Sequence, residues 1–452
     1  MTTKKIAVYA VLTGLVAAFH SNFSQAASPI EHWTQPSGAQ VFLVPSPGIP
    51  MLDIRIDFDA GTRRDHRDQA GLAAVTAGMI DKGVSAGSVG AALDENALGQ
   101  AWADLGAGFS VHASADRMSF SLRTLTYPDL LSKAVQLAAR ELGEPAFSEL
   151  VWKRERERLG AAIREANTRP ATRAGRAFAA AVYGQHPYGF EMTEATLAAI
   201  SVDDMKASYA TWILPCRAKV TMVGAVNRAQ AESLVHELFS RLSAHAAASG
   251  VGCPSLPAVA EVAPLTQASE QRIAFDSAQA HILIGQPGFK RDDPDYFALT
   301  VGNYILGGGG LVSRLSDEVR ERRGLSYSVH SDFGPGLHAG AFVVSLQTRP
   351  DQADEALRLV RRVVADFVVH GPTESELQAA KDYLVGGFAL RIDSNRKLLE
   401  NVASLAWNSL ALNYLDEWSG QVQKVTQADI RAAFARKLQP DRMVTVVLGA
   451  RP

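Results

Sequence analysis

The chain carries one pattern of segments twice. In each half, a short serine-containing segment leads through a run of alternating apolar residues into a stretch of helical periodicity. The three segments are 108–111, 117–125 and 127–142 in the first half, and 326–329, 340–348 and 352–369 in the second. Phe109 and Tyr327 lie 218 positions apart, and Thr221 and Thr445 lie 224 apart. Because the offset changes so little, we predict two copies of one domain.

Apolar periodicity predicts the fold class. Alternation with a period of two favours strands at 39–44, 52–58, 118–122, 272–275, 341–346 and 443–448. Helical periodicity is clearest at 147–167, 205–212 and 374–391. Strands and helices occur in separate runs, which predicts an α+β fold in which each domain is a mainly antiparallel sheet with helices packed on one face. We expect domains at 27–243 and 268–452, joined by a linker at 244–267 that is rich in Ala, Ser, Gly and Pro.

Composition and charge restrict the classes of function. The 452 residues are 47% hydrophobic and 20% charged, as in folded globular proteins. A net charge of -2 gives no electrostatic case for nucleic acid as a partner, because nucleic acid selects for clustered Lys and Arg.

The N-terminus is typical of an export signal. Lys4 and Lys5 precede an apolar run at 6–19, and small residues end the segment at Ala26. We predict a signal peptide at 1–26, cleavage near Ala26, no stable membrane insertion afterwards and a periplasmic location. An uncleaved anchor is the alternative, but the run is shorter than the ~20 residues that span a bilayer.

The cysteines are Cys216 and Cys253. Two thiols outside the cytosol can pair, but their separation along the chain leaves open whether these two do so. Two Cys without supporting His or Cys do not make a zinc site.

Three segments, in this order, resemble the pitrilysin/insulinase family of zinc peptidases. They are GTRRDHRDQAGLAAVTAGMIDKG at 61–83, AVYGQHPYG at 181–189 and LGGGGLVSRLSDEVRERRGLSYSV at 306–329. The resemblance extends over almost the whole chain after residue 26, and the family is built from repeated α+β domains. His186 belongs to the middle segment, which resembles a structural turn of the family, so we expect no catalytic role for it.

The resemblance implies that the metal site is lost. Active members carry His-x-x-Glu-His on a helix, where the two imidazoles bind one zinc and the Glu acts as general base. Aligning the family's Gly-Leu-Ala lead-in places Ala74, Ala77 and Gly78 at these three positions. None of the three can coordinate a metal or accept a proton. We therefore expect no cofactor in this chain.

A more distant Glu supplies the third ligand in active members. It should fall within 154–167, but its register is not fixed by the sequence. Ala161 or Ala162 is the best guess, with Glu157 and Glu165 nearby. The alternating Arg and Glu residues otherwise favour a solvated helical face with ion pairs four residues apart.

The second half keeps residues that the family uses to hold substrate. Arg320 and Tyr327 match an Arg and a Tyr, seven positions apart, that bind the scissile peptide and its oxyanion. The alternative is an Arg in a surface ion-pair cluster with a Tyr in the core.

A glycine run precedes this pair in the sequence. A similar glycine loop lines the family's peptide chamber, which implies substrate contact at Gly307, Gly308, Gly309 and Gly310. A simple turn is the alternative, and the missing Gly-Lys-Ser/Thr ending argues against phosphate binding.

These features predict a non-catalytic subunit. We expect it to pair as a heterodimer with a homologous zinc-bearing peptidase subunit, which supplies zinc and general base, while Arg320 and Tyr327 bind the peptide. An inactive peptide-binding or structural protein of the same fold is the alternative, as is an enzyme with a different metal site.

Overall fold

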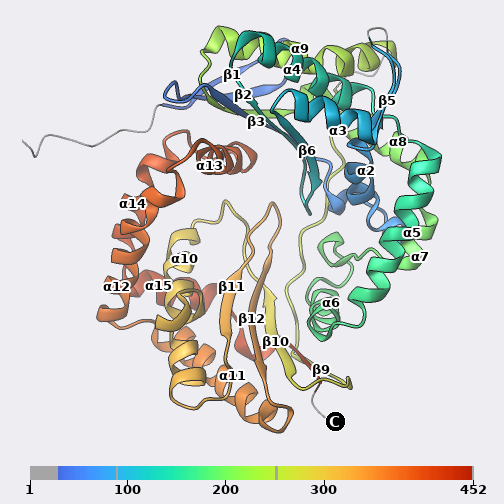
Figure 1. The fold of residues 1–452 in the computed structure, drawn as a ribbon. Helices are drawn as coiled ribbons and strands as arrows, with labels where there is room; N and C mark the ends of the chain where they lie inside the picture. Colours follow the sequence, from blue (N-terminus) through green and yellow to red (C-terminus); the bar gives the residue numbers. More distant parts are fainter. Residues whose placement is uncertain (1–28, 88–89, 250–252, 450–452) are drawn as a thin grey trace, which may run out of the picture.

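Two sheets with one strand order form the framework of the protein. The computed structural model describes residues 29–87, 90–249 and 253–449 (Figure 1). The first sheet has the order β1 (Glu31–Thr34), β2 (Gln40–Pro45), β8 (Lys219–Gly224), β3 (Met51–Phe58), β7 (Met118–Leu125) and β6 (Gly108–Ala113). The second has the order β9 (Ser269–Ile273), β13 (Val444–Leu448), β10 (Ala280–Pro287), β12 (Ala341–Thr348) and β11 (Val329–Phe333).

The two sheets confirm the predicted duplication. Apart from β1, each strand of the first sheet has a counterpart at the same place in the second, from β2 and β9 at one side to β6 and β11 at the other. The pairs β2–β8 and β9–β13 are parallel, and the remaining pairs of neighbouring strands are antiparallel. Both sheets are therefore mainly antiparallel, as predicted. β4 (Gly83–Val84) and β5 (Leu93–Asp94) form a separate small ladder.

Helices follow the strands in separate runs. Those of the first half are α2 (Leu72–Ile80), α3 (Glu95–Asp104), α4 (Pro128–Gly143), α5 (Glu149–Ala166), α6 (Pro170–Tyr183), α7 (Glu194–Ala199), α8 (Val202–Trp212) and α9 (Arg228–Ser249). Those of the second half are α10 (Tyr296–Asn303), α11 (Ala353–His370), α12 (Glu374–Gly386), α13 (Asn395–Trp407), α14 (Tyr414–Lys424) and α15 (Gln427–Lys437).

Each half buries one sheet face under its own helices. Along β3, alternate side chains point to the same face, so Leu52, Ile54, Ile56 and Phe58 all enter a core shared with the helices of the first half. β10 and β12 bury their alternate side chains against α11 and α15 in the same way. The prediction of helices on one sheet face is confirmed for each half.

The opposite sheet faces are covered by an exchange of helices between the halves. α6, from the first half, packs on β10 and β13, where Phe178 meets Val446 and Leu448. α13, from the second half, packs on β8 and β3, with Leu405 against Val223 (Figure 1). The two helices occupy equivalent places on equivalent strands, so each half completes the core of the other.

A lysine secures the end of the exchanged helix α13. Lys219 on β8 donates from Nζ to the carbonyl oxygens of Ala406, at 2.7 Å, and Trp407, at 3.1 Å. The last carbonyls of a helix have no partner within the helix, and a cation is favourable there. The contact therefore ties the two halves through a polar as well as an apolar interaction.

Some element boundaries differ from those predicted. β9 spans Ser269–Ile273 rather than 272–275, because its parallel register with β13 pairs Ser269 with Val444. α12 ends at Gly386, followed by a 3₁₀ turn at Phe388–Arg391, where one helix to 391 was expected. α9 continues to Ser249, inside the predicted linker, because its Ala-rich end has high helix propensity. The domain limits at 243 and 268 stay a prediction.

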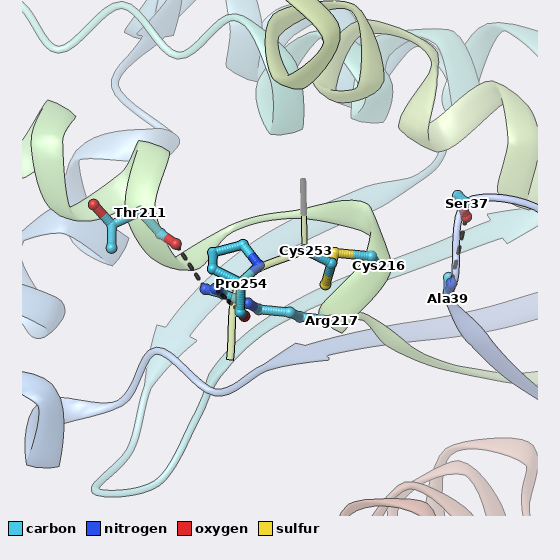
Figure 2. The surroundings of a disulfide bond; sticks show 7 residues. All are labelled: Ser37, Ala39, Thr211, Cys216, Arg217, Cys253 and Pro254. Carbon is cyan, nitrogen blue, oxygen red and sulfur yellow. Dashed lines mark hydrogen bonds between the residues drawn. A yellow bond between two sulfur atoms is a disulfide. The ribbon is translucent and has the colours of Figure 1, made fainter. Parts of the chain in front are cut away.

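A disulfide fixes the start of the connection between the halves. Cys216 and Cys253 are bonded, with their Cα atoms 6.2 Å apart (Figure 2). Next to the bond, Arg217 donates from Nη2 to the carbonyl oxygen of Pro254 at 2.9 Å. The sequence had left this pairing open.

The predicted signal peptide, 1–26, lies outside the described residues. Of the helices that the structure does describe, none combines the length and the apolar character needed to cross a bilayer.

Shortening Phe178 tests the exchange of helices. Phe178→Ala removes the aromatic ring that α6 buries on the second sheet, so it should lower the free energy of unfolding by about 3 kcal/mol in urea denaturation. Leu150→Ala, at an 80% exposed position of α5, is the control and should change it by less than about 0.5 kcal/mol. Equal effects of the two variants would contradict the packing described.

Candidate functional site

α2 holds the positions at which the family carries its metal ligands. The helix begins after Gly71, whose φ of 105° suits glycine and few other residues. The carboxylate of Asp65 accepts hydrogen bonds from the backbone N–H groups of Gly71, at 2.9 Å, and Ala73, at 3.0 Å. These bonds satisfy donors that a helix leaves unpaired at its start. The position of α2 is thus set by its own lead-in segment, without a metal.

A cavity of about 220 Å³ lies between α2 and α5. Its lining is mostly apolar and consists of Ala74, Val75, Gly78, Met79, Trp152, Glu155, Arg158, Leu159 and Met192. A Cβ atom added to Gly78 would meet no atom within 4 Å, so the cavity is open above that residue. Ala77 is buried in the core of the first half. The lost ligand positions therefore face an apolar hollow.

The carboxylate that shares this cavity is Glu155, which the sequence analysis missed. The guess of Ala161 or Ala162 for the third-ligand position was wrong, because neither lines the cavity. Glu155 lies three residues after Trp152 and four before Leu159, which puts the three side chains on one face of α5. The buried side chain of Trp152 was the available signal for the register, since it shows which face of the helix turns inward.

Glu155 is engaged in ion pairs. Its Oε1 lies 2.9 Å from Nη2 of Arg154, and its Oε2 lies 2.8 Å from Nε of Arg158. Burial acts to raise the pKa of Glu155, but the hydrogen bonds from Arg158 and Arg154 outweigh it and hold the pKa below its usual value. The sequence predicted a solvated face with ion pairs four residues apart. The pairs of Glu155 are instead one and three residues apart, and Glu155 is buried.

These residues do not fit a zinc ion. The family uses two His, a general base and a third ligand. This chain keeps only the carboxylate of Glu155 at the third-ligand position, and two guanidinium groups form ion pairs with it. Across the described parts of the chain, no group of three or more His, Cys, Asp and Glu side chains could hold a metal.

Arg320 and Tyr327 lie together on the second half. Arg320 belongs to a π-helical turn at Ser316–Glu321, and its guanidinium carbon lies 5.1 Å from the centre of the Tyr327 ring. Tyr327 is 86% exposed, which rules out the alternative of a core tyrosine. Arg320 also pairs with its neighbour Glu321, at 3.3 Å. Both residues line an open cavity of about 370 Å³ at the end of β12.

The loop that presents Tyr327 is anchored on both sides. The buried hydroxyl of Ser326 lies within hydrogen-bond distance of the carbonyl oxygens of Gln347, at 2.6 Å, and Ser328, at 2.8 Å. Thr348 donates from Oγ1 to the carbonyl oxygen of Leu325 at 2.5 Å. Leu325 and Ser326, before Tyr327, are thereby fixed to β12. After Tyr327, Val329 pairs with Leu346 of β12, while the Tyr327 ring projects into solvent.

The glycine run forms a turn rather than a wall of this cavity. Gly307 is buried in a π-helical turn at Tyr304–Gly308, where an added Cβ would lie 2.5 Å from the backbone nitrogen of Ser331. Gly310 has a φ of 63° and starts a 3₁₀ turn at Gly310–Val312. Neither Gly308 nor Gly309 lines the cavity of Arg320 and Tyr327. Substrate contact by the glycines stays a prediction.

The two sets of predicted site residues line separate cavities. Ala74 and Gly78 face the cavity on α2, whereas Arg320 and Tyr327 face the one at β12. The structure thus brings together the members of each set but not the two sets. His186 starts a 3₁₀ turn at Pro187–Gly189 and accepts from the backbone N–H of Tyr188 through Nδ1, as expected of a structural turn.

Comparisons with known proteins identify the family. Residues 199–384 match the model described as the peptidase M16 inactive domain. The crystal structure of a peptidase M16 inactive domain from Pseudomonas fluorescens is 32% identical, covers 94% of this chain and 98% of its own, and superposes with a TM-score of 0.86. The chain therefore belongs to the peptidase M16 family, as the resemblance to pitrilysin and insulinase predicted, and is a member without the metal-binding residues.

Two further proteins are similar to this chain. It is 29% identical over 276 residues to an uncharacterized zinc protease of Streptomyces coelicolor, a match that spans 60% of this chain and 59% of that protein. The periplasmic protease PqqL of Escherichia coli shares the fold with a TM-score of 0.78 at 18% identity, and the match covers 94% of this chain and 46% of PqqL.

Rebuilding the lost ligands tests the position assigned to Glu155. The double variant Ala74→His and Gly78→His should bind one zinc per chain by metal analysis after dialysis, because the two imidazoles would share the cavity with Glu155. Adding Glu155→Gln should abolish this binding, whereas adding Glu157→Gln, as the matched control, should leave it intact. Retention of zinc without Glu155 would refute the assignment.

Proposed function

We propose that this chain is the non-catalytic subunit of a periplasmic heterodimeric zinc peptidase. The homologous partner would carry the zinc and the general base. This chain would hold the peptide with Arg320 and Tyr327. Peptide hydrolysis would then be a property of the pair.

The exposure of Tyr327 is the observation that carries the proposal. A tyrosine that is 86% exposed and held on a loop anchored at both sides contributes little to the stability of its own chain. Aromatic side chains presented in this way, beside an Arg, are typical of surfaces that contact another molecule. The cavity next to Tyr327 leaves room for that molecule.

The chemistry of the two side chains suits a peptide. The Arg320 guanidinium carries several N–H donors in one plane, and the Tyr327 hydroxyl donates one directed hydrogen bond. Both can donate to a peptide carbonyl, and both would donate more strongly to the oxyanion that forms when water attacks it. Neither side chain can activate that water, which is why the proposal assigns this step to the partner.

Three observations support export to the periplasm. The N-terminus has the pattern of a signal peptide. The disulfide between Cys216 and Cys253 is of a kind that persists in oxidising compartments. The similar protein PqqL is itself periplasmic.

Substitution of the pair tests the proposal. In the complex with the zinc-bearing homologue, Arg320→Ala and Tyr327→Phe should each lower the turnover of a peptide by about 10²–10³, because each removes a donor to the oxyanion. Neither change should prevent assembly, since both residues lie on the surface of this chain. Arg322→Ala is the matched control, because Arg322 is exposed and pairs with Asp317 and Glu318.

The outcome separates this proposal from its alternative. Full turnover of both variants would contradict a shared site. A complex that forms but cleaves nothing, even with both wild-type subunits, would instead favour a protein that binds peptides or supports assembly.

A further inference from the structure

A third cavity lies beneath the exchanged helix α6. It has a volume of about 210 Å³ and is lined by Ala171, Ala174, His281, Ile282, Leu283, Ser328, His330, Ser345, Leu346 and Gln347. The first turns of α6, from the first half of the chain, form one wall, and β10, β12 and β11 form the other. The small side chains of Ala171 and Ala174 leave the hollow open.

The sheet presents polar side chains to this cavity. His281 on β10 pairs in register with Gln347 on β12, and His330 on β11 pairs with Ser345 on β12. Residues two apart on a strand share a face, so all four side chains lie on the face opposite the helical core. The Oγ of Ser345 lies 2.8 Å from Nε2 of His330.

Several of these groups are free to bind a ligand. The side chains of His281, Ser328 and Gln347 form no hydrogen bond with any other residue within the described ranges. None of the residues that line the cavity is acidic. The cavity thus offers hydrogen-bond donors without a carboxylate of its own to receive them.

We propose that the cavity under α6 binds a carboxylate of a peptide, from its C-terminus or from an Asp or Glu side chain. The inference rests on the proposed function only in taking the ligand to be a peptide. Gln347 lines both this cavity and the one that holds Arg320 and Tyr327, and Ser328 directly follows Tyr327. A peptide that contacts Tyr327 can therefore extend into the hollow, so the site would select substrates by an acidic group.

Protonation of His281 should strengthen the binding. Burial lowers the pKa of His281, so its charged form is disfavoured until a carboxylate enters the cavity. Binding should therefore take up a proton and tighten as the pH falls. The charged groups adjoining the lining residues on the surrounding elements are Asp332 on β11, Arg349 after β12, Arg169 just before α6 and Arg173 on α6. Arg169 and Arg349 are already paired, with Glu165 and Asp351.

Calorimetric titration of the purified chain with short blocked peptides tests the site. Acetylated tetra-alanine with a free C-terminal carboxylate should bind at least about tenfold more tightly than the same peptide as its amide. Its affinity should rise between about pH 7.5 and about pH 5.5, whereas that of the amide should not. An amidated peptide with one internal Glu shows whether a side-chain carboxylate binds as well or the site takes the terminus alone.

Three variants and one control make the test specific. His281→Gln and His330→Gln should each reduce the affinity for the free acid to that of the amide. Ala171→Phe fills the cavity from an exposed position of α6 and should have the same effect without touching the sheet. His112→Gln is the matched control, because His112 faces Ser119 in the first half as His330 faces Ser345 in the second. It should bind like the unaltered chain.

Equal binding of acid and amide, binding of neither, or unaltered binding by the three variants would overturn the proposal. The titration uses this chain alone, so its result does not depend on a partner. If the chain binds the carboxylate but forms no heterodimer, the cavity is still a carboxylate site and the proposed function is refuted.

Discussion

The packing of α6 and α13 on each other's halves is the constraint on which the rest of the structure depends. Each sheet has one face covered by its own helices and a second apolar face that its own half leaves open. α6 closes that face on the second half, and α13 closes it on the first. Burying this apolar surface fixes the halves relative to each other, and the cavity beneath α6 exists only because of it.

The loss of the metal ligands has left α2 in place. The start of α2 is held by Asp65, and the apolar side chains of the helix enter the core of the first half. What remains at the former site is an apolar hollow and Glu155, which two Arg residues neutralise. The position of α2 is therefore set by the lead-in segment and the core of its own half.

Local patterns in the sequence were enough to predict the fold class, the duplication and six of the eleven strands in the two main sheets. Alternation along β3 and β12 reports directly on which side chains are buried, so these strands were predicted correctly. The exchange of α6 and α13 was not predictable, because an apolar helical face shows that it is covered but not by which half of the chain. The start of β9 was missed for a related reason, since its exposed side chains give no alternation and its register is set by β13.

The candidate site was only partly predictable. The resemblance to the family supplied Ala74, Ala77 and Gly78, and the seven-residue spacing supplied Arg320 and Tyr327. Glu155 was missed, because the Arg and Glu residues of its helix were interpreted as a solvated face and Trp152, which marks the inward face, was not used to set the register. The cavity of His281 and His330 was also missed, since the two residues lie far apart in the sequence and meet across three strands.

The central claim is that this chain and a homologue that carries the zinc form one peptidase. Its most direct test is purification of the native chain from the periplasm, with mass spectrometry and metal analysis of what accompanies it. The account predicts a homologue with His-x-x-Glu-His in equal amount, and one zinc ion per pair. A chain that is isolated without such a homologue, or that carries the zinc itself, would contradict the account.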